Sequence, residues 1–104
     1  MYKIIFFVPE SHAELVKQAV FDSGAGRQGH YEHCCWQTLG QGEFMPLPGS
    51  QPYIGQANHK QIVAEYRVEL LCDGLYLKSA IDALRKAHPY EEPAIDIIQL
   101  YTPE

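Results

Sequence analysis

Residues 2–8 read Tyr-Lys-Ile-Ile-Phe-Phe-Val, a run rich in β-branched and aromatic side chains that is followed by Pro9. Such a run predicts a β-strand, because these side chains fit a pleated surface and proline disfavours its continuation. Successive side chains point to opposite faces of a strand, and both alternating sets are apolar here. We therefore expect a central strand whose second face is covered by another subunit, since large apolar patches are rare on soluble monomers.

The residues after this strand predict an alternation of helices and strands. Apolar residues at three-and-four spacing predict helices over residues 12–23 and 75–87, and Ser11 and Glu14 have the spacing of a helix capping box. Alternating apolar residues predict a strand over residues 61–72. We also expect strands over residues 31–39 and 94–101.

The resulting order is strand, helix, strand, strand, helix, strand. This order is typical of the ferredoxin-like fold, an α+β sandwich with a βαββαβ topology, and predicts an antiparallel sheet with both helices on one face. Residues 40–60 hold four glycines and three prolines and show little periodicity. A connection of that length predicts a functional or interface loop.

Length, charge and hydropathy limit the possible functions. The 104 residues, with 8 basic and 13 acidic side chains, carry a formal net charge of −5 and are expected to form one domain over residues 1–104. The acidic balance argues against a nucleic-acid partner. The longest apolar run, residues 4–8, is too short to span a bilayer, and no signal peptide is visible. We expect a cytoplasmic protein without membrane contact and with reduced cysteines.

Two glycine- and cysteine-containing stretches invite chemical interpretations that their context weakens. Residues 24–31 have the spacing of a dinucleotide-binding fingerprint, but they follow a predicted helix and precede a predicted strand, the reverse of what that fingerprint needs. His30, His33, Cys34 and Cys35 are close in sequence, yet they lack the paired spacing of a structural zinc site. Packing is therefore the favoured interpretation for Cys34.

Residues 88–93, His-Pro-Tyr-Glu-Glu-Pro, form the most unusual string in the chain. Two prolines stiffen a turn that presents an imidazole, a phenol and two carboxylates at the end of the second helix. Imidazole and carboxylate groups can ligate a metal ion or hold a small polar molecule. The alternative is a rigid connection with solvated acidic side chains, and the string alone favours this structural interpretation.

Several motifs, in the same order along the chain, resemble the YqfO-type proteins of the Ngg-interacting-factor-like family. The motifs lie at residues 24–34, 40–46, 49–55, 65–69 and 88–94. More closely, the chain resembles the extra domain inserted in longer bacterial members. This resemblance implies a ferredoxin-like domain similar to the PII and CutA proteins, which assemble as trimers by packing their sheets around a central axis. It therefore implies a homotrimer.

The resemblance also implies a site at strand and turn edges that a subunit interface could bring together. The candidate ligand-binding residues are Tyr31, Cys34, Glu65 and Tyr90, and the candidate metal ligands are His88 and Glu91. Longer family members contain a two-metal centre built by flanking segments, and the inserted domain lies over it as a lid or access regulator. We expect those segments to be absent from this chain.

Three functional hypotheses follow. The leading one is a non-catalytic binding or regulatory module, an oligomer with an inter-subunit site for a divalent metal ion or a small polar ligand. The second is an accessory domain that docks on a partner carrying a two-metal centre and regulates access to it. The third, a metal-dependent hydrolase, is disfavoured because its metal ligands would belong to the flanking segments.

Overall fold

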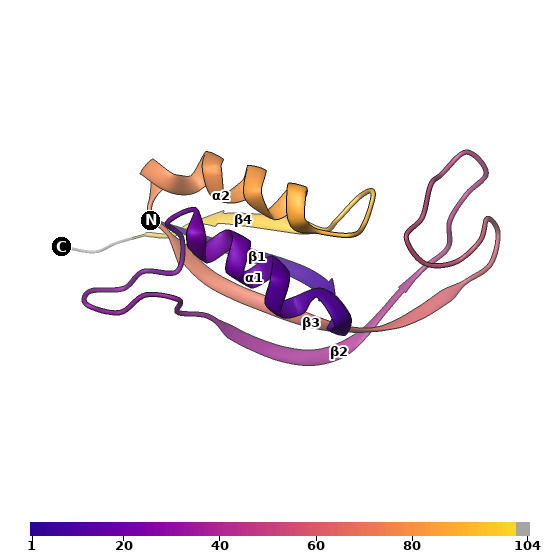
Figure 1. Ribbon diagram of the computed structural model, residues 1–104, viewed down its shortest axis with the longest axis horizontal. Helices are drawn as coiled ribbons and strands as arrows, with labels where there is room; N and C mark the ends of the chain where they lie inside the picture. The colour runs from indigo at the N-terminus through magenta and orange to yellow at the C-terminus, as the bar shows by residue number, and fades with distance from the viewer. Residues whose placement is uncertain (102–104) are drawn as a thin grey trace.

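The sheet of the protein has the predicted topology. The computed structural model describes residues 1–101, in which strands β1 (Tyr2–Pro9), β2 (Trp36–Phe44), β3 (Gln61–Cys72) and β4 (Ile95–Gln99) pair in the order β2-β3-β1-β4. Every neighbouring pair is antiparallel. Helices α1 (Ala13–Asp22) and α2 (Gly74–Ala87) lie on one face, and the short helix η1 (Glu10–His12) leads into α1 (Figure 1). The predicted α+β fold class is confirmed.

The core lies between the helices and one face of the sheet. On β1, the side chains of Ile4, Phe6 and Val8 are fully buried, and their cross-strand partners include Leu70 and Val68 of β3. Burying each such side chain contributes about 1.5–3 kcal/mol. The helices contribute their own buried stripes, which are Ala13, Val16, Val20 and Phe21 from α1 and Ala80 and Leu84 from α2.

The second apolar face of β1 is covered largely within the chain itself. Ile5 is only 4% exposed, and Phe7 is half-buried. Arg67 lies opposite Phe7 with its guanidinium 5.9 Å from the ring centroid, and Glu69, opposite Ile5, pairs with Arg67 at 3.5 Å and with Lys3 at 3.6 Å. Long charged side chains cover apolar surface with their stems while their heads stay in water. The expectation that Ile5 needs a second subunit for burial is therefore wrong.

Strand β2 begins five residues later than the predicted strand over residues 31–39. Gln28 and Tyr31 instead exchange two backbone hydrogen bonds of 2.9 and 3.0 Å in a tight turn. His33 has a φ of 60°, a left-handed conformation that a strand does not contain. The predicted start of this strand at residue 31 is therefore wrong, and His33, Cys34 and Cys35 lie before the strand.

The hairpin formed by β2 and β3 extends past η1 and the start of α1 (Figure 1). We call residues 39–44 and 61–66 the hairpin arm. Leu39 and Ile62 belong to the helix-side face of the sheet, but no helix covers them there, and Ile62 is 59% exposed. Because β2 continues to Phe44, the connecting loop spans residues 45–60 rather than 40–60.

The helix termini differ in how they are capped. Ser11 donates to or accepts from the His12 Nδ1 at 2.9 Å and makes no cap contact, so the predicted capping box is wrong. In contrast, the Asp73 carboxylate accepts a hydrogen bond of 2.9 Å from the Leu75 amide at the start of α2. No helix within residues 1–101 has the length and apolar character needed to cross a bilayer. Cys34, Cys35 and Cys72 are free thiols.

Candidate functional site

A cavity of about 740 Å³ lies between the hairpin arm, the loop over residues 45–60 and the turn over residues 88–93. Its volume is within the range of about 300–1,000 Å³ that is typical of small-molecule sites. Three of the six predicted site residues line it, namely Glu65, Tyr90 and Glu91. The structure thus brings part of the predicted site together on the sheet face opposite the helices.

Glu65 and Tyr90 are joined directly inside this cavity. The Tyr90 hydroxyl donates a hydrogen bond of 2.6 Å to Glu65 Oε2, and the ring of Phe44 lies 6.0 Å from the Tyr90 ring. Burial is the main cause that raises the pKa of Tyr90, and the hydrogen bond to Glu65 and the negative charge of its carboxylate raise it further. Tyr90 therefore stays protonated at physiological pH and serves as a hydrogen-bond donor.

Gly42 of β2 leaves the space that the Glu65 carboxylate occupies. A β-carbon at this position would lie 2.6 Å from the Glu65 carboxylate carbon and closer still to one of its oxygens. Gly42 also lines the cavity. Its role was not predicted, although a glycine inside a strand often marks a place where another group approaches the backbone closely.

His88 is buried behind the cavity and holds the turn in place. It is 6% exposed, and its Nε2 lies 2.6 Å from the Phe7 carbonyl oxygen. The Tyr90 amide donates to His88 Nδ1 at 3.1 Å, so Nδ1 is unprotonated. Nε2 therefore carries the ring proton and donates it in the hydrogen bond to the Phe7 carbonyl oxygen. Burial, as the largest cause, lowers the pKa of His88, which keeps the ring neutral. His88 therefore orients Tyr90.

The side chains in this conformation do not fit a metal ion at His88 and Glu91. Both ring nitrogens of His88 are already engaged, and Glu91 Oε1 accepts a hydrogen bond of 3.1 Å from the Gln51 amide. Nowhere in residues 1–101 do three or more His, Cys, Asp or Glu side chains gather closely enough to hold a metal ion. Metal ligation by this pair stays a prediction, and it requires these contacts to open.

Tyr31 and Cys34 lie far from the cavity over Glu65. Trp36, two residues after Cys34, pairs with Glu69, which is four residues along β3 from Glu65, or about 13 Å at strand spacing. Tyr31 is 75% exposed, on the loop that lies at the same end of the molecule as the N-terminus in Figure 1, opposite to the loop over residues 45–60. Within one chain, the six predicted residues do not form a single site.

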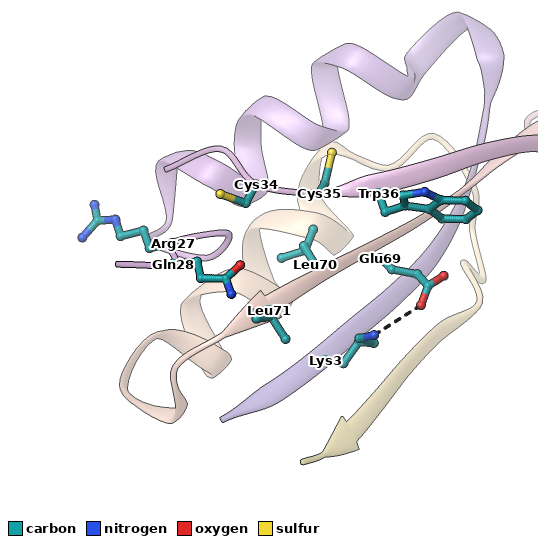
Figure 2. A pocket seen from close by; sticks show the side chains of 9 residues that line it. All are labelled: Lys3, Arg27, Gln28, Cys34, Cys35, Trp36, Glu69, Leu70 and Leu71. Atoms are coloured by element: carbon teal, nitrogen blue, oxygen red, sulfur yellow. Dashed lines mark ion pairs between the residues drawn. The ribbon is translucent and has the colours of Figure 1, made fainter. Parts of the chain in front are cut away.

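A second cavity of about 410 Å³ lies where the loop that contains Cys34 meets the sheet. Figure 2 shows the thiols of Cys34 and Cys35 pointing in different directions and the ion pair of Lys3 with Glu69 below them. The Cys34 amide donates to the Gly26 carbonyl at 2.8 Å, and the Gly26 amide donates to the Leu71 carbonyl of β3 at 2.8 Å, which fixes the loop against the sheet. The lining residues are Lys3, Arg27, Gln28, Cys34, Cys35, Trp36, Glu69, Leu70 and Leu71.

Comparison with curated proteins supports the family resemblance. The chain is 43% identical over 101 residues to the "GTP cyclohydrolase 1 type 2 homolog" of Mycobacterium leprae, a match that covers 97% of this chain and 26% of that protein. The homolog of Bacillus subtilis is 40% identical over 95 residues, 91% of this chain and 26% of the relative. The chain is homologous to the inserted CutA/PII-like domain of these NIF3-like proteins. It spans about a quarter of their length. No family model matches the sequence.

Solved structures place the chain in the same group. A Bacillus cereus protein related to NIF3 superimposes with a TM-score of 0.82 at 37% identity, over 97% of this chain and 26% of that one. The CutA protein of Archaeoglobus fulgidus has a TM-score of 0.69 at 14% identity, over 100% of this chain and 88% of its own. CutA1 of Pyrococcus horikoshii has a TM-score of 0.68 at 15% identity, over 100% of this chain and 87% of that protein. The CutA likeness shows the fold.

Proposed function

We propose that this chain is a non-catalytic ligand-binding module whose site is the cavity over Glu65 and Tyr90. The observation that carries the proposal is the convergence of polar groups on one apolar cavity of small-molecule size. The Tyr90 hydroxyl is held against Glu65, and the buried His88 orients Tyr90 from behind. The Gln51 amide joins the loop over residues 45–60 to Glu91 and so links the two walls of the site.

The module works as a homo-oligomer, and the likeness to CutA proteins supports a trimer. Two features of the described residues support self-association. The hairpin arm exposes Leu39 and Ile62 on its helix-side face, and β2 is an edge strand of the sheet. In such an assembly, the end of one subunit that carries Tyr31 and Cys34 contributes to the site of a neighbour. This arrangement unites all the predicted ligand-binding residues.

Light scattering over a dilution series tests the assembly. Ile62→Glu places a charge on the apolar face of the arm and should shift the protein toward monomers. Leu15→Glu is the matched control, because Leu15 is an exposed side chain on α1 that belongs neither to the arm nor to the end that carries Tyr31 and Cys34. A wild-type protein that is monomeric throughout the series, or an equal effect of both variants, contradicts the oligomer proposal.

A divalent metal ion is the alternative ligand, bound after His88 and Glu91 leave their present contacts. Elemental analysis of the purified protein, followed by light scattering with and without zinc, copper, manganese and magnesium, tests it. Stoichiometric metal that is lost on His88→Ala while the oligomer persists supports the metal alternative. A metal-free oligomer that is indifferent to every ion rejects it and leaves an organic ligand.

The second candidate function is that of an accessory domain that docks on a partner with a two-metal centre. It is favoured by one observation, namely that the homologous segment makes up about a quarter of much longer relatives. Mixing the chain with a form of the Bacillus subtilis relative that lacks the matched segment tests it. Co-elution in size-exclusion chromatography supports docking, and separate elution contradicts it.

A further inference from the structure

The cavity over Glu65 and Tyr90 has an acidic lining. Four glutamates and one arginine line it, namely Glu43, Glu65, Glu91, Glu92 and Arg67, but Glu43 pairs with Ile62 and its side chain belongs to the helix-side face. Arg67 is engaged by Glu69 at 3.5 Å and lies over the ring of Phe7, and Glu43 is paired with Lys60 at 3.4 Å. In residues 1–101, the other three carboxylates make no ion pair, so the field inside the cavity attracts cations and repels anions.

The same cavity also has four aromatic walls. Phe7 and Phe44 come from the sheet, Tyr53 from the loop over residues 45–60, and Tyr90 from the turn over residues 88–93. Ring faces attract cations, and the attraction grows where water is excluded. Most of the remaining lining is apolar, from Met45, Pro46, Leu47, Pro52, Ile54 and Ala94.

Two contacts hold the loop over residues 45–60 beside these walls. Tyr53 packs edge-on against His12 of η1, with ring centroids 5.2 Å apart. The Gln51 amide donates to Glu91 at 3.1 Å. The aromatic and acidic walls therefore face one space, which an apolar body and a positive charge can fill together.

We infer that this cavity selects an organic cation, an amine or quaternary ammonium compound with an apolar or aromatic body. The inference rests on the proposed function, since it names the ligand class of the same cavity. A cation gains from the unpaired carboxylates and from the ring faces, whereas its apolar part displaces water from the aromatic walls. Phosphorylated ligands such as nucleoside triphosphates meet three unpaired carboxylates and are disfavoured.

Three probes with a shared phenyl body separate charge from shape. Phenethylamine is a cation, 2-phenylethanol is neutral and 3-phenylpropionate is an anion. Each is titrated into isotopically labelled protein, and the amide signals of Gly42, Glu65, Tyr90 and Glu91 are followed by two-dimensional NMR. Phenethylamine should bind at least about fivefold more tightly than 2-phenylethanol, and added salt should weaken the binding of the amine but not of the alcohol.

Charge-removing variants locate the effect. Glu65→Gln keeps an acceptor for the Tyr90 hydroxyl and should weaken amine binding about fivefold while leaving the alcohol unchanged. Glu92→Gln, at an exposed position, should act in the same direction and is independent of the Tyr90 contact. Asp82→Asn is the control, because Asp82 is an exposed carboxylate of α2 that does not line the cavity and lies outside the loop that carries Tyr31 and Cys34.

The outcomes distinguish this inference from the proposed function. Equal affinities for the amine and the alcohol, or no change in amine affinity in both Glu65→Gln and Glu92→Gln, overturn the cation class and leave the cavity as a binding site. If none of the three probes shifts an amide signal at the cavity, both the cation class and the proposed binding function are overturned.

Discussion

Replacing Gly42 by alanine tests the geometry of the site most directly. The added methyl group would occupy the space of the Glu65 carboxylate, whose carbon lies 2.6 Å from the position of the new β-carbon. The carboxylate is the end of a flexible side chain and can swing away, so a backbone shift is not required. Its movement breaks the hydrogen bond of 2.6 Å from the Tyr90 hydroxyl.

The expected loss follows from two opposing contributions. A hydrogen bond to a charged group contributes about 1.5–3 kcal/mol, and the partial exposure of this pair places it near the lower figure. Replacing glycine by alanine in a strand returns roughly 0.5 kcal/mol of backbone entropy. Gly42→Ala should therefore destabilise the protein by about 1 kcal/mol.

Gly40 supplies the matched control on the same strand and the same face. The nearest atom to a β-carbon at Gly40 is the Glu65 carbonyl oxygen at 4.0 Å, so Gly40→Ala meets open space and should stabilise the protein by roughly 0.5 kcal/mol. The two glycine variants should thus differ by about 1.5 kcal/mol, which is about tenfold in the unfolding equilibrium.

Urea denaturation followed by circular dichroism, at one fixed protein concentration, measures these differences. A double-mutant cycle with Tyr90→Phe isolates the hydrogen bond, because Gly42→Ala should lose its penalty once the hydroxyl is gone. Equal stabilities of the two glycine variants, or additive effects of Gly42→Ala and Tyr90→Phe, would refute the reasoning.

Three further predictions concern the residues around the site and the loop after α1. Burial lowers the pKa of His88 in the folded state below the unfolded value of 6.5. The contribution of His88 to stability is therefore complete above pH 6.5 and is lost as the pH falls below that value. Urea midpoints at about pH 7.5 and about pH 5.5 should differ more for wild type than for His88→Gln. Because the folded-state pKa of Tyr90 is raised, the advantage of wild type over Tyr90→Phe should be complete below the unfolded value of 10.0 and should shrink as pH rises above it, as followed by alkaline urea titration. Gly26 has a φ of 80°, and a β-carbon there would lie 2.7 Å from the Phe21 ring. Gly26→Ala should therefore lower the free energy of unfolding by about 1–3 kcal/mol, which is more than Gly29→Ala, whose added carbon meets nothing within 4 Å. Thermal unfolding of both variants measures the difference.

The accuracy of the sequence predictions follows the range of the interactions involved. The strand over residues 61–72 has its predicted boundaries, and α2 begins one residue before its predicted start, because side-chain periodicity is a local signal. The predicted start of β2 is five residues too early, because residues 28–31 form a tight turn and His33 has a positive φ. Neither feature is visible in the spacing of apolar residues.

The candidate site was predicted by residue but not by arrangement. Glu65, Tyr90 and Glu91 do line one cavity, whereas Tyr31 and Cys34 lie at the other end of the sheet. The roles of Gly42 and the aromatic residues of the loop were missed, because no spacing along the chain shows that Gly42 faces the Glu65 carboxylate across two strands.

The sequence by itself determined the alternation of helices and strands, the apolar character of both faces of β1 and the unusual turn over residues 88–93. Each of these depends on neighbours within a few positions, where strand and helix periods act. Only the tertiary structure decided that Tyr90 meets Glu65 across 25 residues and that the His88 ring binds the Phe7 carbonyl across 81. These contacts depend on strand register and loop closure, which form when the whole sheet packs and thereby turn a rigid connection into one wall of a cavity.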